Sequence, residues 1–338
     1  SRYSIFNIWT KNGDEFMFEE AKKYIDEADK IYIVGHVGPD GDAVGASFGM
    51  YNALKKIGKN AKVIMPACSD TFKFLPGINE AVENVEESEY DLLIAVDSSD
   101  KTRLAISKED FEKAKHVIVL DHHMANEPYG DFNYINSDLP AASEIIYNFI
   151  SYLNIEIDKV IATYLYLGIM TDTGSFNYSS TKPSTLIVAA NLVATGIDFS
   201  YICKKVNDTI KESKLKLIAK AIDNMEVYYD GRLRYTYVDQ KVMKALGIND
   251  EEAEGMTNYL RMVDGTEVAI YVREKSDGSN KVSMRSNELI DISKIAIANG
   301  GGGHKRAAGF TMQKPYEEAK NELINVVGVM LGDTSTTN

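Results

Sequence analysis

Short apolar runs alternate with longer amphipathic stretches through the first part of the chain. The runs are rich in Val, Ile and Leu and lack polar alternation, which is typical of strands buried on both faces of a parallel sheet. Strands are therefore predicted at 31–34, 61–65, 92–96 and 116–120. The stretches between and after them predict helices at 16–28, 43–57, 143–153, 159–170 and 182–195. Strands that alternate with helices indicate an α/β fold with an open, mostly parallel sheet and helices on both faces.

The pattern changes in the second part of the chain. A charged segment at 199–228 predicts one long helix that connects two domains. Beyond it, segments rich in Val, Tyr and Thr alternate as half-buried strands do, at 232–238, 267–274 and 281–284. Further helices are predicted at 290–299 and 315–331. We predict an N-terminal α/β domain at 1–205, a helical linker at 206–228, a smaller mixed α/β domain at 229–332 and a polar tail at 333–338.

The charge and composition of the chain limit its partners. With 37 basic and 50 acidic residues, the net charge is −13, which argues against the broad basic stripe that a protein tracking long duplex nucleic acid needs. No apolar run approaches the roughly 18 residues of a membrane span, and we see no secretion signal. Two cysteines, Cys68 and Cys203, are too few for a disulfide framework and are expected to be buried as small apolar residues. We therefore predict a cytoplasmic protein with no membrane partner.

Acidic and histidine side chains gather near the ends of the predicted strands. A single Asp at such a place is usually a helix cap or a turn residue, so the prediction depends on their joint occurrence. The carboxyl ends of parallel strands meet at one edge of the sheet, and carboxylates mixed with imidazoles suit a pair of divalent ions such as Mn²⁺ rather than a thiolate zinc site. The residues concerned are His36, Asp40, Asp42, Asp97, Asp121, His122, His123 and, in a glycine-containing turn, Asp172.

A glycine run in the second domain predicts a separate site for an anion. Gly300–Gly303 frees the backbone to bring its N–H groups close to anionic oxygens. A flexible linker is the alternative, but the flanking sequences favour a helix–loop–helix arrangement. Arg285, on or just after a predicted strand, is a candidate for bidentate contact with a phosphate, although it is also compatible with a solvated charge at a strand edge.

Taken together, these motifs resemble the DHH phosphoesterase superfamily, which is named for the triplet found here at Asp121-His122-His123. The second domain is similar to its companion DHHA1 substrate-binding domain, which carries the glycine-rich loop. The segments 171–176 and 283–286 are similar to the oligoribonuclease and 3′-phosphoadenosine-5′-phosphate phosphatase type within that superfamily. The resemblance covers nearly the whole chain, and it implies a two-metal catalytic domain, a substrate-binding domain and a homodimer.

The resemblance also implies a role for each motif residue. Two Mn²⁺ ions are expected, with Mg²⁺ or Co²⁺ as substitutes, and Asp97 would bridge them. The metal ligands would be His36, Asp40 and Asp97 for one ion, and Asp42, Asp97, His122 and Asp172 for the other. The predicted catalytic residues are Asp97, His123 at the scissile phosphate, and Asp121 as a residue that orients a histidine or its loop. The predicted substrate-binding residues are His123, Arg285, Ser286, Gly301, Gly302, Gly303, His304 and Arg306.

The function predicted from these roles is a Mn²⁺-dependent phosphodiesterase. It would cut oligonucleotides of about two to five residues to 5′-mononucleotides, with remote binding energy used to place the reacting phosphate, and would also convert 3′-phosphoadenosine-5′-phosphate to AMP. The alternative substrate class is cyclic or linear signalling dinucleotides such as c-di-AMP, pApA and pGpG. A catalytically silent nucleotide-binding module is the alternative of another class, but such a module would be expected to lack a metal-binding acid, and every acid of the motifs is present.

Overall fold

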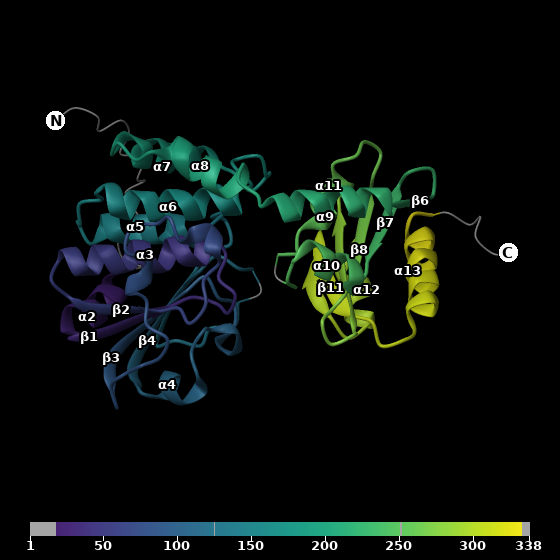
Figure 1. Cartoon of the computed structure of the whole chain (residues 1–338). Helices are drawn as coiled ribbons and strands as arrows, with labels where there is room; N and C mark the ends of the chain where they lie inside the picture. Colours follow the sequence, from purple (N-terminus) through teal and green to yellow (C-terminus); the bar gives the residue numbers. More distant parts are fainter. Residues whose placement is uncertain (1–17, 125, 251, 333–338) are drawn as a thin grey trace. The chain divides into compact units, whose positions relative to one another are not determined.

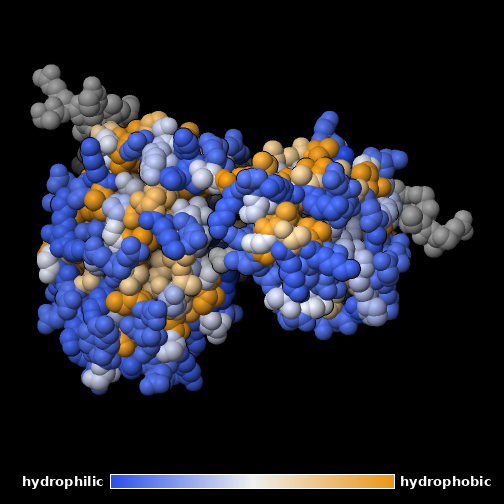
Figure 2. Space-filling model, in the orientation of Figure 1, coloured by the Kyte–Doolittle hydropathy of each residue, from blue (hydrophilic) through white to orange (hydrophobic). Residues whose placement is uncertain are grey.

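The chain divides into two compact units, Ser1–Thr209 and Ile210–Asn338, each with a sheet of its own (Figure 1). The structure is a computed structural model that describes residues 18–124, 126–250 and 252–332. The visible face of each unit is mainly hydrophilic with scattered apolar residues (Figure 2), in keeping with the net charge of −13. Within the described ranges, no single helix is long and apolar enough to cross a bilayer, and one bent pair, Pro183–Ala194 with Phe199–Asn207, passes that test by length and composition only.

The first unit is built on a parallel sheet with the strand order β2-β1-β3-β4-β5. The chain adds strands on both sides of β1, so the sheet has a switch point between β1 and β3, where ligands of such sheets bind. All of the predicted strands are present, and β5 is an addition, because its short segment is interrupted by Asn133 and lacked an apolar run. The strands are β1 (Lys30–Val34), β2 (Asn60–Ile64), β3 (Tyr90–Val96), β4 (Ala114–Asp121) and β5 (Phe132–Ile135).

Side chains from alternate strand positions fill two separate cores. On one face, residues such as Ile33 and Ile94 pack against the long helices, while on the other face Tyr32 and Leu93 pack against a short helix and the chain near Leu104. Figure 1 shows α3 over the sheet with α5 and α6 beyond it. The helices of this unit are α2 (Glu19–Glu27), α3 (Gly41–Lys56), α4 (Lys108–Glu112), α5 (Ala142–Tyr152), α6 (Lys159–Asp172), α7 (Pro183–Ala194) and α8 (Phe199–Asn207), with 3-10 turns at Asp70–Phe72, Ile78–Glu80 and Lys101–Arg103.

The second unit is a mixed sheet with the order β10-β11-β9-β8-β7-β6, in which only β7 and β8 run parallel. Its core joins strand side chains such as Val268 and Met284 to α12 and α13. The strands are β6 (Glu226–Tyr228), β7 (Leu233–Val238), β8 (Val268–Glu274), β9 (Asn280–Ser286), β10 (Gly302–His304) and β11 (Ala307–Thr311). The helices are α9 (Glu212–Asp223), α10 (Gln240–Leu246), α11 (Met256–Arg261), α12 (Ser293–Ala298) and α13 (Tyr316–Met330).

Several predicted elements differ from the structure. The single helix expected at 199–228 is wrong: α8 ends at Asn207, and α9 packs against β7, α10 and α11 as part of the second unit. The helix expected after the glycine run is also wrong, because the small residues at 307–309 form β11, which pairs with β9. The short helices α10 and α11 were not predicted. Cys68 and Cys203 are partly exposed rather than fully buried. Residues 16–17 of the first predicted helix and the tail at 333–338 lie outside the described residues.

Candidate metal centre

Asp97 lies at the end of β3, at the centre of the candidate site. Its backbone has a φ of 52°, a left-handed conformation that costs a non-glycine residue about 1 kcal/mol or more. The Asp97 N–H donates to the carbonyl of Leu120 at 3.1 Å, which ties this turn to β4, and the residue is only 2% exposed. Backbone strain held in place by neighbouring structure is typical of functional sites.

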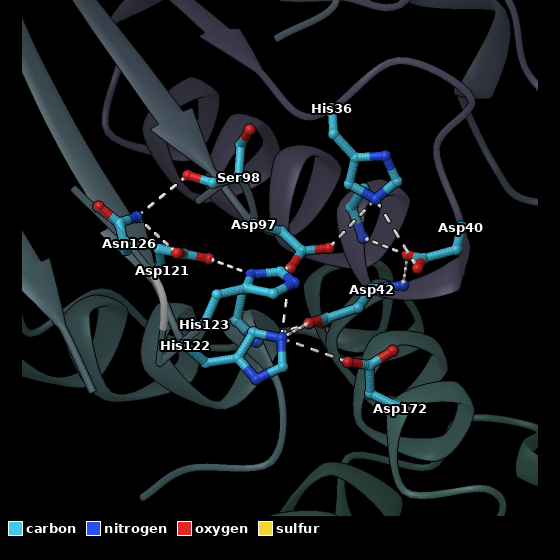
Figure 3. A network of polar contacts seen from close by, with 12 residues as sticks. His36, Asp40, Asp42, Asp97, Ser98, Asp121, His122, His123, Asn126 and Asp172 are labelled. Atoms are coloured by element: carbon cyan, nitrogen blue, oxygen red, sulfur yellow. Dashed lines mark hydrogen bonds and ion pairs between the residues drawn. The ribbon is translucent and has the colours of Figure 1, made fainter. Parts of the chain in front are cut away.

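The two carboxylate oxygens of Asp97 point toward different histidines (Figure 3). Oδ2 lies 3.6 Å from His36 Nε2, and Oδ1 lies 3.3 Å from His122 Nε2. Oδ1 is buried and accepts no hydrogen bond within the described part of the chain. Its neighbours are the ring nitrogens His122 Nε2 at 3.3 Å and His123 Nδ1 at 3.8 Å, so this buried oxygen fits a position that faces a proton or a cation. Asp97 therefore has the geometry of a ligand shared by two neighbouring groups.

The first of these groups joins Asp97 to His36 and Asp40. His36 Nε2 lies 3.7 Å from Asp40 Oδ2, while its Nδ1 donates to the Val37 carbonyl at 3.0 Å. That bond directs Nε2 to the carboxylates, as in metal-binding histidines. Asp40 is also the N-cap of α3, since its Oδ1 accepts the N–H groups of Asp42 and Ala43 at 3.0 and 3.1 Å. Capping and metal binding are thus compatible, because each uses a different oxygen.

The second group joins His122 to Asp42 and Asp172. His122 Nε2 lies 3.9 Å from Asp42 Oδ2 and 3.3 Å from Asp172 Oδ2. Asp42 is fully buried, and its carboxylate accepts the N–H groups of Ala142 and Ser143 in the first turn of α5, at 2.5 and 2.9 Å. A helix N-terminus favours the negative charge there. Asp172 is the last residue of α6 rather than a turn residue as predicted.

Asp121 and His123 form a pair beside these two groups. The Asp121 carboxylate is completely buried, and its Oδ1 accepts a hydrogen bond from His123 Nδ1 at 2.7 Å. Its Oδ2 accepts one from Asn126 Nδ2 at 2.5 Å. Burial alone would raise the pKa of Asp121, but the hydrogen bonds from His123 and Asn126 and the nearby imidazoles lower it. Since Asp121 holds Nδ1, contact between His123 and a ligand would be made through Nε2.

The pKa values of the two groups indicate strong mutual repulsion. Burial and the neighbouring carboxylates raise the pKa of Asp172 to about 9 and that of Asp42 to about 7. Burial lowers the pKa of His122, but Asp97, Asp42 and Asp172 outweigh it and raise the value to about 10. Protons bound to these groups offset the carboxylate charge, as two bound divalent ions would. The hard oxygen and imidazole donors therefore fit a pair of divalent ions.

These shifts predict how the stability of metal-free protein depends on pH. The folded-state pKa values of Asp42, Asp172, His36 and His122 lie above their ordinary values, so the folded state binds more protons than the unfolded state. Stability in EDTA should fall as pH rises from about 6 to 9. Asp40 has a lowered pKa, but its effect is confined to acid pH, below that window.

With excess Mn²⁺, the stability of the protein should instead rise with pH over this range, because the ligands must lose protons to bind metal. Thermal melts across this pH range, with EDTA and with Mn²⁺, measure both effects. Asp172→Asn should flatten the slope in EDTA, since it removes one of the groups with a raised pKa. A melting temperature that rises with pH in EDTA would show that these groups do not bind protons as described.

Gly168 allows α6 to pass close to two groups that support the second metal position. A methyl group there would lie 1.9 Å from Ser143 Oγ and 2.6 Å from Asp42 Oδ1. We expect Gly168→Ala to displace Asp42 and to remove most of the Mn²⁺-induced rise in melting temperature, while Thr163→Ala on the same helix keeps it. Melts with and without Mn²⁺ compare the two variants, and a full Mn²⁺ effect in Gly168→Ala would contradict the close approach.

Family models match both units of the chain. Residues 30–169 match the DHH family N-terminal domain, and residues 234–331 match the DHHA1 domain. A curated relative from Thermus thermophilus is 31% identical over 285 residues, which cover 84% of each chain. The chain belongs to the DHH family of phosphoesterases. That relative is named a bifunctional oligoribonuclease and PAP phosphatase NrnA, and so is one from Mycoplasma genitalium, which is 30% identical over 91% of this chain and 97% of its own.

Two solved structures share the fold of this chain. An exopolyphosphatase-related protein from Bacteroides fragilis superposes with a TM-score of 0.87 at 27% identity, and the match covers 94% of this chain and 97% of that one. RecJ from Thermus thermophilus, solved in complex with Mn²⁺, gives a TM-score of 0.53 at 13% identity and shares the fold over 93% of this chain and 54% of its own.

Several residues that the sequence assigned to substrate binding in the DHHA1 domain have partners within that domain. Arg285 lies in β9, and its Nη1 donates to the Met284 carbonyl at 3.0 Å. The buried Ser286 hydroxyl donates to the Ile290 carbonyl at 2.7 Å. Arg306 donates to the carbonyls of Ile290 and Glu288. Arg306 and Ser286 therefore stabilise the segment after β9, and direct contact of either with substrate stays a prediction.

Two positions of the glycine run require glycine because of the local backbone conformation and packing. Gly303 has a φ of 138°, and a methyl group at Gly301 would lie 2.2 Å from the Gly309 carbonyl of β11. A methyl group at Gly302 would meet no atom within 4 Å. The Gly301 N–H donates to the Ala296 carbonyl at 2.8 Å, so it is not directed at an anion as predicted. His304 belongs to β10, but its side chain lies outside the described residues, so its contact with substrate also stays a prediction.

Sequence reasoning did not identify Asn126 or the backbone groups that hold Asp42. Asn126 is separated from His123 by two residues and resembles an ordinary turn residue in the sequence. The N–H groups of Ala142 and Ser143 carry no side-chain signal, and they reach Asp42 from 100 and 101 residues away. The short run Ala141-Ala142-Ser143 at a helix start was the available indication, because small residues there allow close approach of an anion.

Proposed function

We propose that this protein is a two-metal phosphodiesterase that cuts short oligonucleotides to 5′-mononucleotides and also removes the 3′-phosphate of 3′-phosphoadenosine-5′-phosphate. The observation that carries the proposal is the Asp97 carboxylate, whose two oxygens face two separate histidine and carboxylate groups at 3.6 and 3.3 Å. A shared carboxylate is what two ions about 3.5–4 Å apart require. The names of the NrnA relatives support the substrate class.

The proposed metals are two Mn²⁺ ions, with Mg²⁺ or Co²⁺ as substitutes. His36 Nε2 and Asp40 Oδ2 would hold the first ion, Asp42, His122 and Asp172 the second, and Asp97 both. When bound, the pair would supply a hydroxide nucleophile at neutral pH and neutralise charge on the phosphate. The α5 N-terminus and the Asp40 cap hold two of these carboxylates in place without rearrangement, which favours rapid chemistry.

The remaining residues would position the substrate. With protons on both ring nitrogens, His123 would donate from Nε2 to a non-bridging oxygen of the scissile phosphate and from Nδ1 to Asp121 Oδ1, which lies at 2.7 Å. In the DHHA1 domain, Arg285 and the backbone of Gly302 and Gly303 would bind a further phosphate of the substrate. Short substrates are favoured because a chain of net charge −13 has no basic run that would hold a long strand.

We also propose a homodimer that acts in a reducing cytoplasm. Cys68 and Cys203 are unpaired, which suits that compartment. The dimer rests on the family resemblance alone, and light scattering on the purified chain measures it.

The proposed function is tested with two substrates that should share one site. Mn²⁺-loaded protein should hydrolyse both a 5′-phosphorylated dinucleotide and 3′-phosphoadenosine-5′-phosphate, and each should inhibit the other competitively with a Ki equal to its own KM. The isosteric variant Asp97→Asn should lose both activities. A cyclic dinucleotide serves as the comparison substrate: turnover of it without turnover of the other two would replace the proposal with a signalling phosphodiesterase.

A further inference from the structure

Asn126 joins the two loops that carry the central residues of the metal site. Its Nδ2 donates to Asp121 Oδ2 at 2.5 Å and to the Ser98 carbonyl at 3.1 Å (Figure 3). Asp121 belongs to the β4 end that leads into His122 and His123, and Ser98 directly follows Asp97. A single amide group therefore links the segment that carries both histidines to the segment that carries the shared carboxylate.

The chemistry of this position requires the amide nitrogen. Both partners of Asn126 are acceptors, and an amide NH₂ offers two donors at one atom, so the nitrogen must face them. The Asn126 Oδ1 atom is buried and accepts no hydrogen bond from the residues that the structure describes. A buried polar atom without a partner is unfavourable for stability. Asn126 is therefore better explained by the two bonds that its nitrogen makes than by a gain in packing.

The two acceptors of Asn126 differ in the number of other hydrogen bonds that they accept. The Ser98 carbonyl also accepts a hydrogen bond from the Tyr129 hydroxyl at 3.1 Å, so it keeps one donor when Asn126 is removed. Asp121 Oδ2 has Asn126 as its one hydrogen-bond donor within ranges 18–124, 126–250 and 252–332. The other oxygen of the same carboxylate fixes His123 Nδ1 at 2.7 Å. Loss of Asn126 would thus release the carboxylate that orients His123.

We propose that Asn126 is a positioning residue that acts through Asp121 to fix the His123 imidazole toward the reacting phosphate. Asn126 itself binds neither metal nor substrate. The inference rests on the proposed function, because His123 is assigned there to the scissile phosphate. A group that acts only on orientation at the reacting phosphate should change kcat, and should leave substrate KM and metal binding largely unchanged.

The kinetic test compares Asn126→Leu, which has a similar size but no donors, with Asn126→Ser, a smaller polar variant that guards against misfolding. We expect kcat on a 5′-phosphorylated dinucleotide to fall about 10–100-fold in both variants, with KM and the Mn²⁺-induced rise in melting temperature within about twofold of wild type. Tyr129→Phe is the matched control, because it removes only a bond to Ser98, and its kcat should stay within about threefold. Equal losses in Tyr129→Phe and Asn126→Leu, or a loss confined to KM or metal binding, would overturn the inference.

A double-variant comparison tests whether the effect passes through Asp121. If it does, Asn126→Leu should change kcat little in an Asp121→Asn background, since the carboxylate that it orients is already gone. Multiplicative losses in the double variant would show that Asn126 and Asp121 act separately and would overturn the proposed route.

A spectroscopic test separates this inference from the proposed function. The chain has five histidines, so protein labelled with ¹⁵N at histidine gives few imidazole N–H signals. The strong bond to Asp121 should give His123 a downfield Nδ1–H proton that is absent from His123→Gln, and that is lost or shifted in Asn126→Leu but kept in Tyr129→Phe. If the wild-type protein cuts no nucleotide, only the proposed function is wrong. If the His123 signal is unchanged in Asn126→Leu, the positioning role is wrong.

Discussion

Asp97→Ala should lower turnover by more than about 10⁴-fold, since the change removes several kcal/mol of charge stabilisation at the reacting phosphate. The reason is that both oxygens of Asp97 are in use, one 3.6 Å from His36 Nε2 and the other 3.3 Å from His122 Nε2. Without that carboxylate, neither group retains its shared ligand. Steady-state kinetics with a parallel Mn²⁺ titration should show weakened binding of metal together with the loss of activity.

The effect of Asp97→Ala is to be compared with that of His123→Ala. That variant should lose one contact to the transition state, which is worth about 10²–10³ in rate, and should keep its Mn²⁺ affinity. Asp97→Asn is a useful third variant because it preserves shape while removing charge. Tight binding of two ions and measurable turnover in Asp97→Ala would show that Asp97 is not the bridge.

Arg285→Ala should lower kcat/KM for nucleotides by about 10²-fold, as expected for a lost charge-assisted phosphate contact. Arg285 lies in β9 of the DHHA1 domain, outside the unit that holds the metal site. The loss should therefore spare a small generic diester, bis(p-nitrophenyl) phosphate, which lacks a remote phosphate. His304→Ala should behave in the same way. Initial rates on the dinucleotide and on the generic diester measure the difference.

Lys281→Ala provides the matched control for Arg285→Ala. Lys281 carries the same charge on the same face of β9, four positions earlier, and pairs with Glu254 at 2.7 Å. Its loss should leave both activities within about twofold of wild type. If Arg285→Ala lowers the rate equally on both substrates, the effect is a general structural one, and a role of Arg285 in substrate binding is contradicted.

The clustering of the candidate metal ligands was predictable because it depends on strand order along the chain. Apolar runs marked β1, β3 and β4, and the acids and histidines that follow them had to meet at one sheet edge. Residues whose partners are distant in sequence were not predictable in this way. Asp42 gains its environment from the N-terminus of α5, 100 residues away, and Asn126 gains its role from the Ser98 carbonyl.

The glycine run shows why local pattern failed in the DHHA1 domain. Ala307-Ala308-Gly309 resembles a helix start in isolation, yet Gly309 pairs with Gly302 and with Ser283 in the sheet. Pairing with β9 therefore overrides the helix preference of alanine. Arg306 illustrates the same limit, because its guanidinium looked like a phosphate ligand but reaches the carbonyls of Glu288 and Ile290.

Hydrolysis rates on RNAs of increasing length separate an enzyme for short oligonucleotides from an exonuclease for long strands. Mn²⁺-loaded protein would be given 5′-phosphorylated RNAs from two to about 20 nucleotides, and release of 5′-mononucleotides would be followed over time. With a net charge of −13 and no basic run in the sequence to hold a long strand, kcat/KM should be highest for the shortest substrates and should fall beyond about five nucleotides. Rates that stay level or climb toward the longest RNAs would contradict the preference for short substrates and indicate a processive single-strand exonuclease.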